Sequence, residues 1–187
     1  MAIKTFTTGE LLTASDTNTY LANSGLVYVA QASPTANATI NIDSVFTSTY
    51  RNYYVVVRGT ASSGSAVYLR WRATGATLTD NIYSVSMGNS NGTTAFGGVA
   101  RSDQYALFPA MYPTYPTNVT MTIYNPQVSD YTSFNLQSNY PITATDLGQT
   151  IQSGSNKVTT AIDGFQLTTA AAPTLAITYY IYGIRNS

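Results

Sequence analysis

Two tyrosines in a proline-stiffened segment are the side chains of this chain best suited to bind a ligand. Residues 108–116 read FPAMYPTYP, so Tyr112 and Tyr115 each stand directly before a proline. Exposed tyrosine rings stack on the faces of sugars and offer a hydroxyl group, at a low entropic cost. Tyr112 and Tyr115 are therefore the candidate residues for contact with a saccharide. The alternative is that both rings pack within their loop or against another subunit.

A pair of arginines offers a different chemistry. Arg70 and Arg72 are two residues apart in an alternating run, which places them with Tyr68 on one face of a predicted strand. Two guanidinium groups that point the same way could clamp an anion. We favour the alternative, in which they lie on a solvated or interfacial face and pair with an aspartate of a neighbouring strand.

Catalytic groups are scarce. Glycoside hydrolysis needs two carboxylates that face each other across about 5–9.5 Å, but Glu10 is the only glutamate and no aspartate has another acid at short spacing. Most aspartates stand beside turn residues, as Asp163 does before Gly164, where this side chain commonly caps or turns the chain. Without histidine or cysteine, a Ser-His-Asp triad and thiol chemistry are excluded within one chain. We predict no enzymatic activity, no cofactor and no metal site.

Composition narrows the range of partners. Charged residues make up 9% of the 187 positions, and the formal net charge is zero, whereas an average protein carries roughly 25% charged residues. Eight dispersed lysines and arginines form no basic patch, so nucleic acid is not an expected partner. No apolar stretch approaches the length of about 18 residues that crosses a bilayer, so we expect no membrane insertion.

The elements that must position these side chains are strands. From Gly25 onward apolar and polar residues alternate, as in residues 67–73, where Trp71 falls on the inward side. Residues 53–57 form a continuous β-branched and aromatic run, which is typical of a strand buried on both faces. Other predicted strands cover residues 26–29, 40–42, 119–124, 134–137 and 177–182.

Clusters of turn residues separate these runs, among them residues 61–64, 88–92 and 153–156. Short strands at short spacing predict an all-β domain over residues 26–187, an antiparallel β-sandwich or barrel.

The first 25 residues differ from the rest of the chain. Thr13 and Asp16 stand three positions apart, a weakened capping box that predicts a short helix from Ala14 to Ala22. A helix of that length does not persist alone in water, so it must dock on its own domain or on a partner. The arm over residues 1–25 would make its contacts through apolar side chains, namely Leu11, Leu12, Tyr20 and Leu21.

The predicted surface has few charges. Outward positions carry mostly Thr, Ser, Asn, Gln and Tyr, and the only lysines are Lys4 and Lys157. Free monomers usually defend their surfaces and sheet edges with charge. This pattern favours a protein whose surface is partly covered by copies of itself or by a larger body.

Four segments resemble virion proteins of tailed bacteriophages. Such proteins begin with a Gly-Glu-x-Leu-Thr-Ala-x-Asp-x-Asn segment similar to the one within residues 6–23, which read FTTGELLTASDTNTYLAN. Their β-sandwich carries a feature similar to SVFTSTYRNYY at residues 44–54. Their closing strands resemble IDGF at residues 162–165 and YYIYGI at residues 179–184. The resemblance spans most of the chain.

The resemblance implies a jelly-roll-like sandwich located on the virion, commonly trimeric, with the N-terminal arm bound to other virion proteins. The first hypothesis is therefore a short tail fibre or fibre-tip protein that assembles as a homotrimer and binds host surface glycans. A capsid decoration protein on the head is the alternative within this group, and it would have no glycan site. A monomeric carbohydrate-binding module is a second hypothesis from another class, and a depolymerase is a third.

Overall fold

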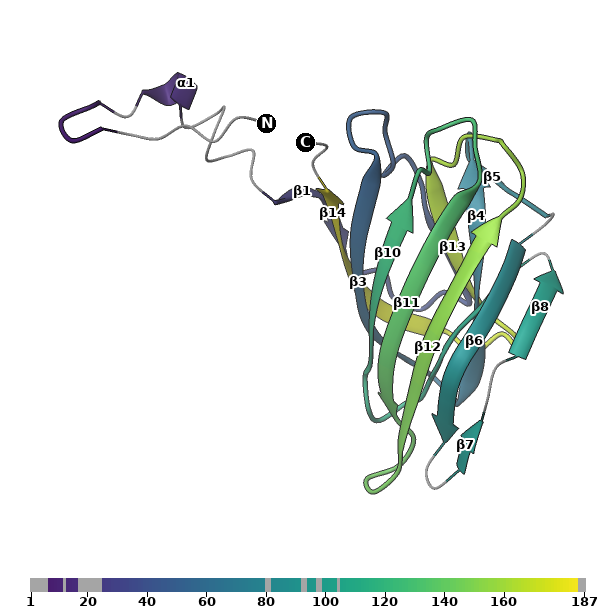
Figure 1. The fold of residues 1–187 in the computed structure, drawn as a ribbon. Helices are drawn as coiled ribbons and strands as arrows, with labels where there is room; N and C mark the ends of the chain where they lie inside the picture. Colours follow the sequence, from purple (N-terminus) through teal and green to yellow (C-terminus); the bar gives the residue numbers. More distant parts are fainter. Residues whose placement is uncertain are drawn as a thin grey trace.

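The computed structural model describes residues 7–11, 13–16, 25–79, 82–91, 94–96, 99–103 and 105–184. Two antiparallel β-sheets pack face to face in a β-sandwich (Figure 1), which confirms the predicted all-β class. The described strands are β1 (Leu26–Ala32), β2 (Thr39–Ile42), β3 (Asn52–Ala61), β4 (Ser65–Ala73), β5 (Ala76–Thr77), β6 (Ile82–Asn91), β7 (Thr94–Phe96), β8 (Val99–Asp103), β9 (Ala106–Met111), β10 (Thr117–Tyr124), β11 (Thr132–Pro141), β12 (Leu147–Asn156), β13 (Gly164–Thr169) and β14 (Leu175–Ile184).

The larger sheet has nine strands in the order β1-β14-β3-β10-β11-β12-β6-β7, and β8 also pairs with β6. The smaller sheet has five strands in the order β2-β13-β4-β5, and β9 pairs with β4. Figure 1 looks onto the outer face of the nine-stranded sheet, with β4 and β13 behind it. Each sheet therefore has one face turned to the core and one face turned outward.

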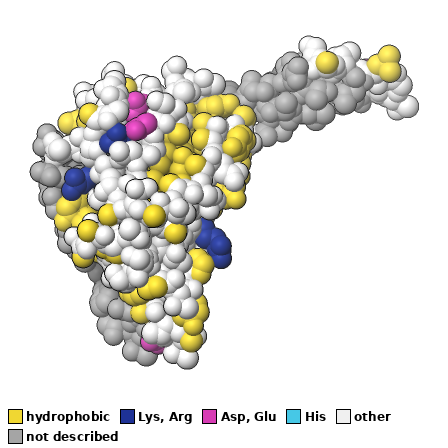
Figure 2. Space-filling view, turned by 180° about the vertical axis from the view of Figure 1, so that it is seen from behind, with side chains coloured by type: hydrophobic (Ala, Val, Ile, Leu, Met, Phe, Trp, Pro, Cys, Tyr) yellow, Lys and Arg dark blue, Asp and Glu magenta, His cyan; other side chains and the backbone are white. Residues whose placement is uncertain are grey.

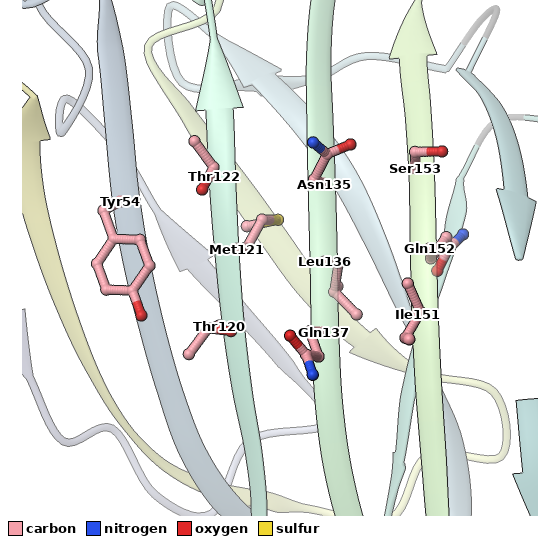
Figure 3. Close-up of a pocket in the computed structure, with 10 residues that line it drawn as sticks. All are labelled: Tyr54, Thr120, Met121, Thr122, Asn135, Leu136, Gln137, Ile151, Gln152 and Ser153. Carbon is pink, nitrogen blue, oxygen red and sulfur yellow. The ribbon is translucent and has the colours of Figure 1, made fainter. Parts of the chain in front are cut away.

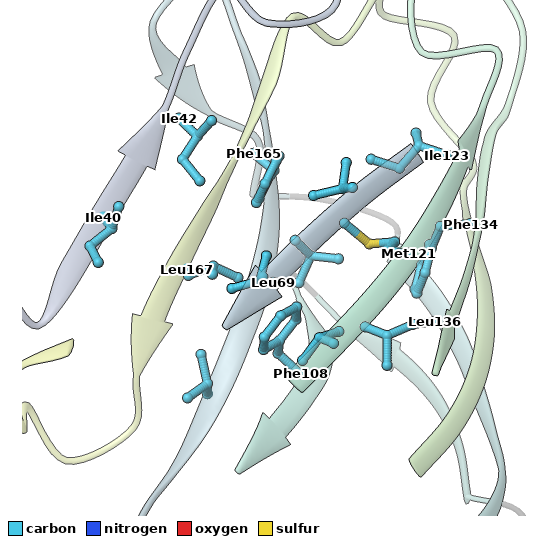
Figure 4. Close-up of a cluster of buried hydrophobic side chains, with 14 of the residues drawn as sticks. Ile40, Ile42, Leu69, Phe108, Met121, Ile123, Phe134, Leu136, Phe165 and Leu167 are labelled. Carbon is cyan, nitrogen blue, oxygen red and sulfur yellow. The ribbon is translucent and has the colours of Figure 1, made fainter. Parts of the chain in front are cut away.

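Alternating residues of both sheets fill the core. Ile40, Ile42, Leu69, Phe165 and Leu167 of the five-stranded sheet face a second set from the opposite layer (Figure 4). That set is formed by Met121, Ile123, Phe134 and Leu136, and Phe108 on β9 adds to the side of the five-stranded sheet. Burying a side chain of this size contributes about 1.5–3 kcal/mol, so the two rows hold the sheets together.

Trp71 lies in this core as predicted. Its side chain is fully buried, and its ring meets the ring of Phe134 edge to face, with centroids 5.7 Å apart. The contact joins β4 to β11, and therefore joins the two sheets across the interior.

The prediction for residues 53–57 was wrong on one face. Tyr53, Val55 and Val57 are buried in the core, but Tyr54 and Val56 on the opposite face are only half-buried. No described element covers that face, so the side chains are shielded only by their neighbours on β10 and β14. Tyr54 is consequently available at the outer surface.

Two predicted turns were also wrong. Residues 88–91 lie in β6 and residues 153–156 lie in β12, inside the nine-stranded sheet. β12 is hydrogen-bonded to β11 on one side and to β6 on the other. Pairing on both sides overrides the weak local preference of Gly, Ser and Asn for turns.

The N-terminal segment is described only in part. Ala14–Asp16 form one helical turn, α1, which lies away from the sandwich in Figure 1. Leu11 is 84% exposed, whereas Leu12, Tyr20, Leu21 and the rest of the predicted helix lie outside the described residues. Among the described residues, no helix has the length and apolar character needed to cross a bilayer.

Candidate functional site

Cross-strand pairing places four side chains in one row on the outer face of the nine-stranded sheet. Tyr54 on β3 is the register partner of Thr122 on β10, and Thr122 is the partner of Asn135 on β11. Asn135 is in turn the partner of Ser153 on β12. Opposed side chains in antiparallel strands have Cβ atoms about 4.5–5.5 Å apart, so the four form a continuous strip across the sheet (Figure 3).

A second row lies beside the first. Val56, Thr120, Gln137 and Ile151 are register partners on the same four strands. Between them the two rows border a groove with a volume of about 520 Å³. The side chains of Met121, Leu136 and Gln152 at the intervening positions are buried toward the interior, so the main chain at these positions forms the floor of the groove. We call this hollow, bounded by Tyr54, Thr120, Thr122, Asn135, Gln137, Ile151 and Ser153, the sheet groove.

The sheet groove combines one aromatic ring, hydrogen-bonding side chains and a small apolar contact. Asn135, Gln137 and Ser153 are exposed, and Ile151 is 45% exposed. The Asn135 amide donates to the Tyr124 hydroxyl at 3.3 Å, while Gln137 and Ser153 have no side-chain hydrogen bond within the described part of the chain. These amide and hydroxyl groups are therefore able to bond to an incoming ligand.

Further tyrosines extend the strip beyond the groove. Tyr182 on β14 is the register partner of Tyr54, and Tyr28 on β1 is the partner of Tyr182. The rings of Tyr28 and Tyr182 meet edge to face with centroids 6.3 Å apart, and Tyr28 is 59% exposed. From β1 to β12 the row crosses six strands, and five spacings of about 4.8 Å give a length of about 24 Å.

The outer face that holds this row is nearly uncharged. Among the described strands β1, β14, β3, β10, β11 and β12, the only charged side chain on this face is the exposed Arg58. No charged residue borders the sheet groove itself. A ligand that fits this chemistry is neutral, rich in hydroxyl groups and provided with an apolar face.

The two tyrosines singled out from the sequence lie elsewhere. Tyr112 directly follows β9 and is half-buried, with its ring nearly parallel to that of Tyr140 and the centroids 6.4 Å apart. A Cβ atom at Gly64 would stand 3.1 Å from the Tyr112 ring, so the ring also packs against the main chain there. Tyr115 is half-buried as well. Neither residue borders the sheet groove, and their contact with a saccharide stays a prediction.

Burial affects the ionisation of Tyr140, whose ring lies nearly parallel to that of Tyr112. Loss of solvent raises the pKa of the Tyr140 phenol above its ordinary value, and the nearby Tyr112 adds a smaller rise. A hydrogen bond with Thr150 acts in the opposite direction. The Tyr140 phenol therefore stays protonated over the neutral range.

The arginines lie on the outer face of the five-stranded sheet. The buried Arg72 binds Asp43, just past the end of β2, through both Nε and Nη2. Nη1 donates to the Thr77 hydroxyl at 2.7 Å, and Nη2 also donates to the Gly75 carbonyl. Arg72 pairs with an aspartate as predicted, but Asp43 follows β2, which is not adjacent to β4, and Arg72 is buried rather than solvated. Arg70 has no carboxylate partner among the described residues.

Asp163 has the turn role that its sequence position predicts. One carboxylate oxygen accepts from the main-chain N–H of Thr74 at 2.8 Å, and the Asp163 carbonyl accepts from the N–H groups of Val45 and Phe46. Asp163 therefore stabilises the loops at one end of the sandwich. In the described part of the chain, no group of three or more acidic residues is placed to hold a metal ion.

The fold and this groove define an all-β sandwich protein whose larger sheet has a nearly uncharged outer face. No protein-family model, no curated protein and no solved structure matches the chain. Function is therefore inferred from the residues themselves.

Sequence reasoning missed the sheet groove for an identifiable reason. Tyr54 stands in the continuous run at residues 53–57, whose pattern is typical of a strand buried on both faces. Asn135 and Gln137 alternate with Phe134 and Leu136, and this alternation already assigned them to an outward face. Only the strand order, which brings β3, β10, β11 and β12 side by side, joins these residues into one site.

Proposed function

We propose that this chain is a non-catalytic saccharide-binding protein that uses the outer face of its nine-stranded sheet. The observation that carries the proposal is the strip of Tyr54, Thr122, Asn135 and Ser153 along an uncharged groove of about 520 Å³. Tyrosine supplies a ring for the apolar face of a sugar. Amide and hydroxyl groups supply donors and acceptors for sugar hydroxyls.

The dimensions favour an extended glycan over a single sugar. The volume lies within the range of about 300–1,000 Å³ that is typical of small-molecule sites, yet the groove lies open on a sheet surface that continues toward Tyr182 and Tyr28. A glycan that crosses the strands would contact the tyrosine end and the amide end of the row together.

We propose that this chain is a short tail fibre or fibre-tip protein of a tailed bacteriophage. It would have a jelly-roll-like sandwich, assemble as a homotrimer on the virion and be anchored by a helical arm over residues 1–25. The resemblance of residues 6–23 and 179–184 to virion proteins supports this setting. The 84% exposure of Leu11 in the predicted arm also supports it. A capsid decoration protein would share the arm but would not bind a glycan in the sheet groove.

Glycan-array binding with three sets of variants tests the saccharide proposal. We expect Asn135→Ala with Gln137→Ala to reduce binding at least about tenfold, because several hydrogen bonds are lost together. Asn139→Ala is the matched control, because Asn139 is exposed on the same face of β11 but does not border the groove. Loss of binding in Tyr112→Ala with Tyr115→Ala alone would move the site to the loop. Absence of binding to any glycan would reject the function.

The assembly proposal has a separate test. Light scattering on the purified chain should give the mass of a trimer, and a clean monomer at micromolar concentration would favour the carbohydrate-binding module. A chain lacking residues 1–25 should keep the sandwich but no longer enter particles. Incorporation of the shortened chain would reject the anchoring role.

A further inference from the structure

Arg70 and Arg72 lie two residues apart on the same face of β4, but their surroundings differ. Arg72 is surrounded by acceptors, among them the carboxylate of Asp43. Arg70 is half-buried, and its Nε atom is buried without a hydrogen-bond partner. An arginine stays charged at every physiological pH, so Arg70 holds a charge at the surface with no counter-ion among the described residues.

Two aromatic rings hold the Arg70 side chain in place. The guanidinium carbon lies 5.8 Å from the centre of the Tyr105 ring, within the range of a cation–π contact. The Tyr105 ring packs against that of Tyr68, with centroids 4.0 Å apart and planes inclined by 39°. Both tyrosines are half-buried, so part of each ring remains open to solvent beside the charge.

The described neighbours of Arg70 bring no competing acid. Its register partner on β13 is Gln166, whose amide donates to Asn41 at 2.7 Å and to Thr77 at 3.1 Å. The carboxylate of Asp43 is held by Arg72. Within the described residues, the Arg70 guanidinium therefore lies next to two aromatic rings, with no carboxylate left to pair with it.

We propose that Arg70, Tyr68 and Tyr105 form a second binding site, which takes the carboxylate of an acidic sugar such as a hexuronate. A guanidinium binds a carboxylate through two parallel hydrogen bonds, and the adjacent rings suit the apolar face of a pyranose. This site lies on the five-stranded sheet and needs a charged ligand, so it goes beyond the neutral saccharide site proposed above. Figure 2, which looks onto this side, shows charged side chains at only a few points of a largely uncharged surface.

Nuclear magnetic resonance of the arginine Nε–H groups tests the site on the full chain. Sodium glucuronate and sodium galacturonate should shift the Arg70 signal in a saturable manner, while glucose should leave it unchanged. Arg70→Gln should weaken binding about tenfold or more, since charge-assisted hydrogen bonds are lost. Arg70→Lys should recover part of it, because it keeps the charge but not the fork. Arg58→Gln, on the opposite sheet, is the control and should bind hexuronate normally.

Other outcomes would overturn the proposal. An equal response to sodium sulfate would indicate a general anion site, and a stronger response to a glutamate-rich peptide would indicate a protein partner. Binding that survives Arg70→Gln in a folded variant would place the site elsewhere. Tyr105→Ala, which leaves Arg70 in place, provides a second test and should weaken hexuronate binding. Because the sheet groove is untouched in these variants, its binding of neutral glycans is measured independently.

Discussion

The outer faces of the two sheets carry similar residue types but use them differently. On the five-stranded sheet, polar side chains bond mainly to one another: Thr39 pairs with Thr168 at 2.8 Å, and Gln166 bonds to Asn41. On the nine-stranded sheet, Gln137 and Ser153 are exposed and have no side-chain partner within the described residues. Polar groups that satisfy one another stabilise a fold, whereas polar groups that are solvated can exchange water for a ligand.

The largest stability effect should come from the ion pair of the five-stranded sheet. Asp43→Ala leaves the buried Arg72 guanidinium without its counter-ion, and we expect a loss of about 2–3 kcal/mol in the free energy of unfolding. This is below the value for a fully buried pair, because the Asp43 side chain is 37% exposed. Urea denaturation measures the change. Arg58→Ala on the other face should stay within about 0.5 kcal/mol, and equal losses in both variants would refute the contrast.

Two glutamines test the same comparison between the two sheets, with smaller expected losses of stability. Gln166 is 8% exposed and bonded to two side chains, so Gln166→Ala should cost about 1 kcal/mol in unfolding free energy. Gln137→Ala should cost less than about 0.5 kcal/mol, because Gln137 is exposed to solvent on the other sheet. Both variants are compared by urea denaturation. A larger loss in Gln137→Ala would mean that the outer groove is structural.

A third prediction concerns pH. The pKa of Tyr140 is raised in the folded chain chiefly by burial, and that of Tyr179 is raised by burial with a smaller contribution from Tyr28. A raised tyrosine pKa favours the protonated phenol, so its contribution is fully present below the unfolded pKa of about 10 and is lost as pH rises through the folded value. Melting temperature should therefore fall above pH 10.

Tyr140→Phe provides the check on that decline. The variant removes one titrating group, so its melting temperature should fall less steeply above pH 10, even though loss of the Thr150 hydrogen bond lowers stability at neutral pH. An unchanged slope would show that Tyr140 does not contribute to the alkaline decline.

Much of the architecture could be predicted from alternation in the sequence. The inward position of Trp71 and the outward positions of Asn135 and Gln137 follow directly from the period of two. The turn role of Asp163 follows from its place before Gly164. These features are local, because each depends on the residues next to it in the chain.

The features that could not be predicted depend on residues far apart in the chain. Residues 88–91 and 153–156 are poor in apolar side chains, and they lie in strands because β11, β12 and β6 hydrogen-bond in succession. The run at residues 53–57 predicts a buried Tyr54, because the sequence does not show whether a further layer covers the outer face of the strand. Strand order joins Tyr54 to Ser153, almost one hundred positions later. Tyr112 and Tyr115 do not border the groove that results.

The most direct test of the saccharide proposal follows the side-chain amide signals of Asn135 and Gln137 by nuclear magnetic resonance. The probe is the neutral oligosaccharide that binds best on a glycan array, and the exposed Asn139 serves as the internal reference. We expect the Asn135 and Gln137 signals to shift with a common saturating curve while Asn139 remains in place. Unchanged signals at Asn135 and Gln137, with binding still detected, would show that the outer face of the nine-stranded sheet is not the site.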